Sequence, residues 1–451
     1  MVTLHTDSSM SNQVVRKYLR PPLMVRATEL SCCLALIFLI VWPKYAYFGG
    51  AIRANPFTVS TLCASLLLFV TLLLDENFSK RIFASIVGGI SISMAIAFWC
   101  AVRIIADLYS KSPDAIGITI HDITNQGVFF LITIVVVNSS DGLRKFLRIF
   151  IFASLALFLV GLYEFIVGDF FMNLFKDFLS GDSLLLGAKL ALKTKNNMIR
   201  IQSLFGHPIV FAQYCAAVAP LFLALLFTSK RLKYRSFYIA LFIACAFMIY
   251  ATQSRSGLLA IFLSVSIFVL LYFWRTKEKF RTEIFLLGII AIMIVALALS
   301  STIMGIVYGS DISEISSTMA RATMWDKSAP YISQSWFLGY GDGQSIFLGG
   351  LSFASQEAQY SSVDDSALSI ILNFGLLGLF AFALFVGTIL WSNAASLVKG
   401  DRSLAGIYAS FFSACVAIVF VQKAISITDN IALLYVISGA FCSIQAKKYL
   451  Q

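Results

Sequence analysis

Twelve long apolar runs constrain the fold of this sequence more than any other feature. A transmembrane α-helix needs roughly 20 mostly apolar residues, and each run is close to that length. We therefore predict an all-α protein, a single integral membrane domain over residues 1–451 built as a polytopic bundle of about 12 transmembrane helices. The runs lie at about 28–47, 56–74, 82–109, 119–139, 146–168, 207–228, 236–253, 257–274, 284–308, 365–393, 403–422 and 427–445.

The composition excludes the common classes of soluble protein. Hydrophobic residues make up 59% of the chain and charged residues 13%, against about 45–50% and about 25% in soluble domains. A soluble fold of this size could not bury so much apolar surface, which excludes soluble enzymes, nucleic-acid binders and disordered scaffolds. The formal net charge of +11 then indicates basic residues beside membrane spans rather than contacts with nucleic acid.

The basic residues predict how the chain crosses the membrane. Of the 34 Lys and Arg residues, 21 fall in alternate connections between the apolar runs. Short loops rich in Lys and Arg stay in the cytoplasm, so we predict a multi-pass protein with both termini cytoplasmic and a cytoplasmic tail over 1–27. These residues are Arg16, Lys17, Arg20, Arg26, Lys80, Arg81, Arg144, Lys145, Arg148, Lys230, Arg231, Lys233, Arg235, Arg275, Lys277, Lys279, Arg281, Lys399, Arg402, Lys447 and Lys448.

Two of the predicted outer connections are long. The first, 169–206, mixes Lys and Arg with leucines, a mixture typical of an amphipathic helix at a membrane surface. The second, 309–364, follows the ninth run and carries tryptophans, tyrosines and glycines. Long loops of this kind are more often functional than connective, so we expect any chemistry at the outer face. The sequence contains no GxxxxGKS or GxxxxGKT motif for ATP.

Four polar or glycine-containing segments stand out in this outer region. Each is a weak signal alone, and their order along the chain carries the information. They are Arg200–Pro208 (RIQSLFGHP), Ser254–Gly257 (SRSG), Arg321–Trp325 (RATMW) with Gly339–Gly343 (GYGDG), and Asp364–Leu368 (DDSAL) with Asn373–Leu379 (NFGLLGL).

In this order the segments resemble the O-antigen ligase and polymerase superfamily, over roughly residues 200–380. The resemblance implies a glycosyltransferase of the bacterial inner membrane that needs no cofactor. Its substrates would be undecaprenyl-diphosphate-linked glycans of O-antigen or exopolysaccharide, bound at the outer face. A repeat-unit flippase and a chain-length regulator would be candidate protein partners, and the lipid bilayer is the remaining one.

One departure from the family pattern favours a polymerase. Ligases of this superfamily typically carry His-Asn about eleven residues before the glycine of the last motif. Counting back from Gly375 places Asp364 at the histidine position and Asp365 at the asparagine position. The function expected is therefore polymerisation of repeat units, and transfer of a finished glycan to lipid A core is the alternative.

Three arginines are candidates to hold the diphosphate, because an arginine fork makes two parallel hydrogen bonds to phosphate oxygens. Arg255 lies in the SRSG turn, where an interfacial arginine that reaches for water is the alternative. Arg321 precedes Trp325 by one helical turn, so both can share a face and contact the substrate. Arg200 ends a basic loop, where attraction to lipid headgroups is the alternative.

The candidate general base is Asp364. Its alternative role is that of a polar residue at the start of a helix, where aspartate is favoured as the N-cap. Asp365 is better placed as the helix cap, and we assign it, with Glu164 and His207, to substrate binding. Glu164 lies near the outer end of a span and is also the second candidate for the base, or an interface residue. A histidine placed as His207 is, just before a proline at the start of a span, more often supports its loop by hydrogen bonding. The sequence lacks a DxD pair for Mg-diphosphate, so we expect no metal.

A secondary transporter or lipid-linked oligosaccharide flippase is the alternative from another class. Twelve spans with cytoplasmic termini would suit that architecture. The sequence shows neither an internal repeat between its halves nor charges clustered at midspan, which transporters often have. Its polar residues gather at one face instead, which favours the enzyme.

Overall fold

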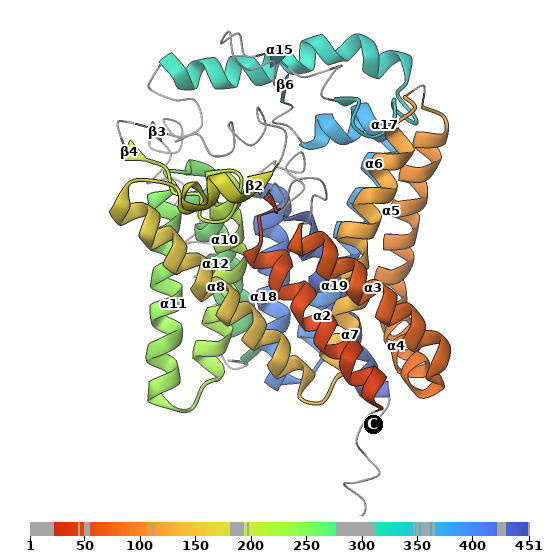
Figure 1. The fold of residues 1–451 in the computed structure, drawn as a ribbon, viewed down its shortest axis with the longest axis vertical. Coiled ribbons are helices and arrows are strands. Elements are labelled where there is room, and N and C mark those ends of the chain that lie inside the picture. Colours follow the sequence, from red (N-terminus) through yellow and green to blue (C-terminus); the bar gives the residue numbers. More distant parts are fainter. Residues whose placement is uncertain are drawn as a thin grey trace, which may run out of the picture.

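The computed structural model describes residues 22–43, 46–48, 55–110, 112–180, 194–195, 198–276, 312–345, 348, 351–352, 361–362, 366–421 and 430–449. Long helices stand side by side as a bundle, and one helix, α15 (Ile312–Gln334), lies across one end of it (Figure 1). This arrangement confirms the predicted all-α membrane bundle.

Ten helical stretches in the described chain are long and apolar enough to cross a membrane. With the shorter apolar helix α19 (Ile431–Tyr449), they cover eleven of the twelve predicted runs. The run 284–308 lies outside the described residues. The ten stretches are α2 (Leu23–Val41), α3 (Pro56–Leu74), α5 (Ile90–Leu108), α6–η1–α7 (Ala115–Asn138), α8 (Gly142–Val167), α10 (Pro208–Thr228), α11 (Leu232–Ala251), α12 (Arg255–Thr276), α17 (Ser366–Lys399) and Arg402–Val419.

Several of these stretches contain shorter elements. The fourth stretch passes through a π-helix, and so does the end of the tenth. The elements are α6 (Ala115–Asp122), π-helix η1 (Ile123–Gly127), α7 (Val128–Asn138), 3-10 helix η4 (Arg402–Leu404), α18 (Ala405–Val416) and π-helix η5 (Ala417–Val421).

The predicted run 82–109 is divided in two. Helix α4 (Glu76–Gly88) ends at Gly89, and α5 then begins. A Cβ atom on Gly89 would lie 2.1 Å from Cys442 Sγ in α19. The close approach of α19 therefore favours a glycine at the position where the two helices meet.

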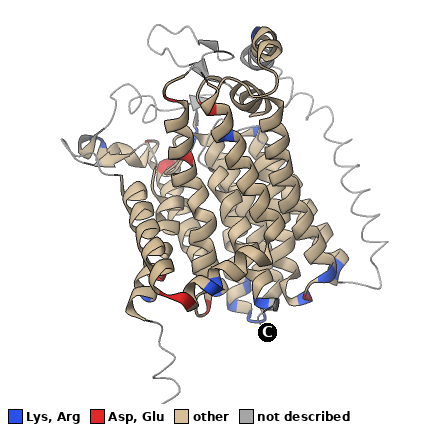
Figure 2. Cartoon of the chain, turned by 90° about the vertical axis from the view of Figure 1, so that its right-hand side faces the viewer, with Lys and Arg blue, Asp and Glu red and all other residues tan. Residues whose placement is uncertain are grey.

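Lys and Arg gather at the end of the bundle where α19 finishes, which we call the basic end (Figure 2). Helix α2 starts at the same end (Figure 1). The opposite end carries α15 and the segment after α8, and we call it the loop end. The basic residues of the alternate connections between apolar runs, on which the predicted orientation depends, thus include those at the basic end.

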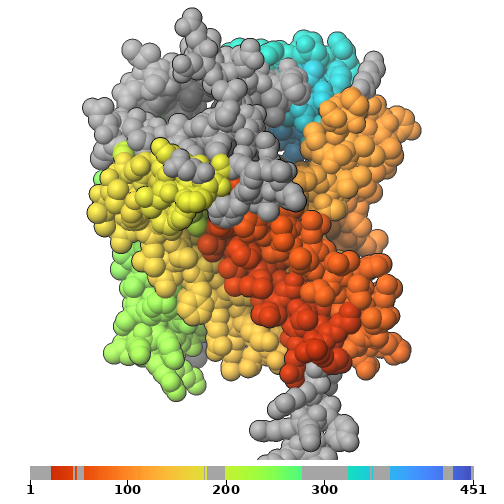
Figure 3. Space-filling view, in the orientation of Figure 1, coloured from red at the N-terminus to blue at the C-terminus, as the bar shows by residue number. Residues whose placement is uncertain are grey.

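The loop end also contains 3-10 helix η2 (Phe171–Phe178) and three two-residue strand pairs. Within the predicted segment 169–206 the described helix is the short η2, in which Met172 is buried and Leu174 and Phe178 are exposed. Residues 181–193 lie outside the described chain. Figure 3 shows η2, in yellow, exposed on the same face as α2, in red. The antiparallel pairs are β1 (Tyr47–Phe48) with β2 (Leu179–Ser180), β3 (Thr194–Lys195) with β4 (Met198–Ile199), and β5 (Leu351–Ser352) with β6 (Ser361–Ser362).

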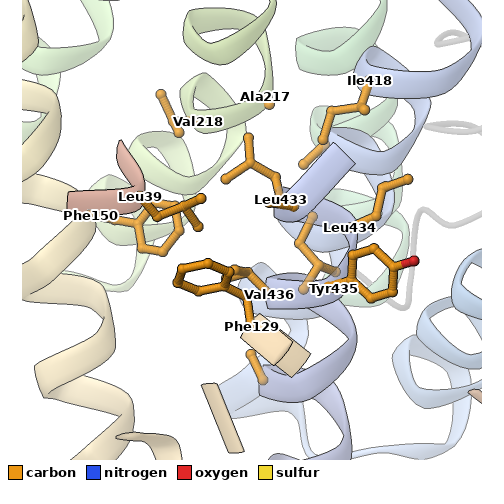
Figure 4. Packing of buried hydrophobic residues seen from close by; sticks show 14 of the residues in the cluster. Leu39, Phe129, Phe150, Ala217, Val218, Ile418, Leu433, Leu434, Tyr435 and Val436 are labelled. Carbon is orange, nitrogen blue, oxygen red and sulfur yellow. The ribbon is translucent and has the colours of Figure 1, made fainter. Parts of the chain in front are cut away.

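The core is centred on α10, which contacts α11, α12 and α18. Small residues let these helices approach closely; Gly257 lies against Ala212, where an added Cβ atom would be 2.7 Å from the alanine Cβ. Figure 4 shows the packing of large residues from several helices, among them Phe150, Leu433 and Tyr435. The cavity between α8, α10, α18 and α19 is apolar and measures about 30 Å³, too small for a sugar or a lipid chain.

Candidate functional site

The first two sequence motifs meet at the turn between α11 and α12. Arg200 Nε donates a hydrogen bond to the carbonyl of Thr252 at 3.0 Å. Arg255 begins α12 three residues later. Ser254 Oγ accepts the backbone N–H of Gly257 at 3.1 Å and thereby closes the first turn of that helix. Arg200 and Arg255 therefore flank one turn at the loop end.

Arg200 is a half-buried cation. Burial lowers the pKa of its guanidinium from the ordinary value, because the charged form loses solvation. Among the described residues, no carboxylate lies within ion-pair distance of it. A desolvated guanidinium of this kind favours an anion, since an anion would restore part of the lost solvation energy.

Glu164 anchors the segment that follows Arg200. Its side chain is fully buried in α8. One carboxylate oxygen accepts the backbone N–H groups of Ser203 at 2.7 Å and Gln202 at 3.0 Å, and the other accepts that of Phe171 at 3.3 Å. Backbone donors thus occupy both oxygens of this candidate substrate-binding residue.

His207 lies at the start of α10. Its Nδ1 accepts the backbone N–H of Ile209 at 3.2 Å, and Pro208 fills the first helical position. This contact is of the loop-supporting kind expected from the sequence. A substrate contact by the rest of the ring stays a prediction.

Helix α15 packs against the start of α17 through a small hydrophobic cluster of Met324, Leu368 and Leu372. Arg321 lies in α15 one turn before Met324, and its side chain is outside the described residues. Trp325, the next residue after Met324, is exposed.

Asp364 and Asp365 also lie outside the described residues, and α17 begins directly after them at Ser366. The hydrophobic cluster therefore brings together the helices that carry or follow the third and fourth motifs. Within the described residues, no three His, Cys, Asp or Glu side chains gather as a metal site.

The glycine motifs of the long loop and of α17 interlock. The backbone N–H of Gly341 donates to Asn373 at 2.8 Å, and that of Leu376 donates to Trp336 at 2.8 Å. Gly375 opens α17 with a φ of 66° and a ψ of −166°, a conformation essentially restricted to glycine. The GYGDG segment therefore fits against an opened turn of α17.

Arg103, which lies outside the four sequence motifs, connects the same loop to α5 and α6. It is 7% exposed, and its Nη2 donates to Asp122 at 2.8 Å and also to Asp342. The backbone N–H of Asp342 donates to Asp107 Oδ1 at 2.8 Å. A buried network of one guanidinium and three carboxylates thus lies where the GYGDG segment meets the bundle.

Part of the chain is similar to a known protein family. Residues 239–383 match a family model described as O-antigen ligase. The match covers about a third of the chain and supports, over this range, its resemblance to the O-antigen ligase and polymerase superfamily. No curated protein matches the chain. The matched range begins in α11 and ends in α17, so it contains Arg255, Arg321, Asp342 and Asp364.

The matched range 239–383 leaves out Arg103, Asp107 and Asp122, together with Glu164 and Arg200. Their contacts join this range to the rest of the bundle. One sequence signal could have found Arg103, since an ionisable residue within a membrane span is a functional candidate by default. The apolar run that surrounds it concealed that signal.

Proposed function

We propose that the protein is a glycosyltransferase that polymerises oligosaccharide repeat units carried on undecaprenyl diphosphate, as part of O-antigen or exopolysaccharide synthesis. The observation that carries the proposal is the Arg200–Thr252 hydrogen bond of 3.0 Å. It holds one arginine beside the turn from which a second, Arg255, begins α12. Two arginines at one turn provide forked hydrogen-bond donors for a diphosphate. The negative charge of a diphosphate is concentrated on its oxygens, and an arginine can bind two of them at once.

The reaction forms one glycosidic bond and breaks one bond to phosphate. The acceptor hydroxyl oxygen attacks the anomeric carbon of the donor, and its proton passes to the Asp364 carboxylate. The bond from that carbon to the diphosphate breaks, and its electron pair leaves with the lipid diphosphate. Arg255 and Arg321 hold this leaving group, so the developing charge needs no metal ion.

The remaining assigned residues bind or position the substrate. Arg200 contacts the diphosphate from the other side of the turn. Trp325 offers an exposed ring to the glycan, and His207 contacts it from the start of α10. Asp365 caps α17 beside the base. In this proposal Glu164 acts through the backbone of residues 202–203, which it holds.

The proposed orientation places the basic end in the cytoplasm and the loop end outside the inner membrane. The concentration of Lys and Arg at the end where α19 finishes supports it. Both termini are then cytoplasmic. Lipid-linked repeat units would reach the loop end from the outer leaflet, delivered by a flippase, and a chain-length regulator is a further candidate partner.

The proposal is tested with the purified full chain in lipid vesicles. It is given an undecaprenyl-diphosphate-linked oligosaccharide, either alone or with lipid A core, and products are resolved by size. A ladder of lengthened oligosaccharides from the donor alone supports the polymerase. A product that requires lipid A core would instead identify a ligase. Movement of the donor across the vesicle without any new glycosidic bond would contradict both and identify a transporter.

A further inference from the structure

We infer that Arg103 is a positioning residue that holds the long loop, through Asp342, in the register that the reaction requires. The inference rests on the proposed function, since it names a further residue for the same reaction. Arg103 belongs to α5 and Asp342 to the GYGDG segment, and 239 residues of chain separate them.

Both members of the pair are held from several sides. The guanidinium of Arg103 lies over the rings of Trp99 and Phe374, at 5.6 Å and 5.3 Å from their centroids. Asp342 accepts hydrogen bonds from Thr119 Oγ1 at 3.0 Å and from Asn373 Nδ2 at 3.3 Å, besides that from Arg103. The carboxylate of Asp342 therefore joins α5, α6 and α17 at one point.

The polar character of this contact indicates a role in register. Apolar residues of similar volume would stabilise a membrane bundle at least as well as a buried ion pair, whose desolvation offsets much of its attraction. A guanidinium with two carboxylate partners, Asp122 and Asp342, instead permits one geometry and penalises every other. The neighbouring hydrogen bonds of the GYGDG backbone to Asn373 and Asp107 depend on that same geometry.

The register reaches the proposed site along the chain. Helix α15, which carries Arg321 and Trp325, ends at Gln334, shortly before the segment that Asp342 fastens. The same segment is attached to α17 next to Asn373, whose Oδ1 accepts the backbone N–H of Ser345 at 2.7 Å. Releasing Asp342 should therefore shift α15 relative to the start of α17, and a shift of about 1 Å at reacting groups can cost about a hundredfold in rate.

The test uses the full-length protein and three substitutions. Asp342→Asn removes the charge and keeps the shape, and Thr119→Val removes one hydrogen bond from the same carboxylate. Arg144→Gln is the matched control, because Arg144 forms an ion pair with Asp141 in which both side chains are more than 70% exposed, at 77% and 72%. Each variant is measured for thermal midpoint, polymerisation rate, polyprenyl diphosphate affinity, and trypsin cleavage after Lys327, an exposed residue of α15.

For Asp342→Asn we expect the rate to fall by about tenfold to a hundredfold. Diphosphate affinity should fall less than in Arg321→Lys, because Arg321 is kept and Arg200 and Arg255 lie at a different turn. Cleavage after Lys327 should be about tenfold faster as α15 opens more often. Thr119→Val should change the polymerisation rate and the cleavage rate in the same directions but by less. It serves as the test if Asp342→Asn does not fold. The control should behave as wild type.

Two results would overturn the inference: unchanged rate and cleavage in both network variants, or losses that only follow the fraction of folded protein. If the wild type makes no polymer but Asp342→Asn still speeds cleavage selectively, the positioning contact stands and the proposed reaction is wrong.

Discussion

Glu164 Oε2 accepts the backbone N–H of Ser203 at 2.7 Å, across 39 residues of chain. Glu164→Gln would keep the size of the side chain and place an amide NH₂ where a backbone donor now finds an acceptor. Leaving a buried donor unsatisfied costs about 1–3 kcal/mol, so we expect a lower thermal midpoint. Glu76→Gln is the control, because that carboxylate is 81% exposed in its ion pair with Lys80. Equal midpoints for Glu164→Gln and wild type would show that these hydrogen bonds do not hold the loop.

Gly375→Ala should destabilise the protein by roughly 1–3 kcal/mol or more, because its backbone conformation is restricted to glycine. An added Cβ atom would also lie 2.1 Å from the carbonyl oxygen of Phe337. Gly387→Ala in the same helix meets nothing within 4 Å and should stabilise by about 0.5–1 kcal/mol, because alanine favours helix. Thermal unfolding of both variants is the measurement. An equal tolerance of alanine at the two positions would mean that α17 is not opened at Gly375.

Asp364→Asn should keep folding and lose most activity, because loss of a general base typically costs about 10²–10⁴ in rate. Asp365→Asn should be milder, since asparagine caps helices as well as aspartate does. The measurement is polymer formation in membranes supplied with lipid-linked repeat units and EDTA. Full activity of Asp364→Asn would exclude it as the base. Loss of wild-type activity in EDTA would instead indicate a metal requirement.

The membrane orientation can be tested by labelling single cysteines in a cysteine-free background. Ser333 is exposed on α15, at the loop end. Ser403 is exposed in η4, which follows the last residue of α17. We expect a membrane-impermeant thiol reagent to label Ser333→Cys from outside intact cells and Ser403→Cys only after the cells are opened. Labelling of both from the same side would contradict the proposed topology.

The spans could be predicted from the sequence because a local property defines them. Apolar length marks each helix, and local caps mark several starts, such as Asn55 before α3 and His207 before α10. The break at Gly89 could not be predicted in this way. Gly89 lies against Cys442, whose Sγ is 3.8 Å from the Gly89 carbonyl oxygen although the two are 353 positions apart in the sequence.

In the candidate site, too, local motifs could be predicted from the sequence and contacts between distant residues could not. Arg255 and Arg321 could be selected because their motifs are short and ordered along the chain. The partners of Arg103 could not be predicted, because Asp122 and Asp342 are 19 and 239 residues away in the sequence. The anchoring role of Glu164 likewise depends on backbone groups from another segment. Pairing between distant polar groups is therefore what the structure adds.

The central claim, that the loop-end arginines grip a lipid diphosphate, is tested most directly by the affinity of the purified protein for a polyprenyl diphosphate. Arg255→Lys keeps the charge and loses the forked hydrogen bonds, each worth about 1.5–3 kcal/mol to a charged group. Arg321→Lys should act alike, and Arg235→Lys, at an exposed position of α11 near the basic end, is the matched control. The account predicts affinity about tenfold weaker or more for Arg255→Lys and Arg321→Lys, and unchanged for Arg235→Lys. Wild-type affinity in both Arg255→Lys and Arg321→Lys would contradict it.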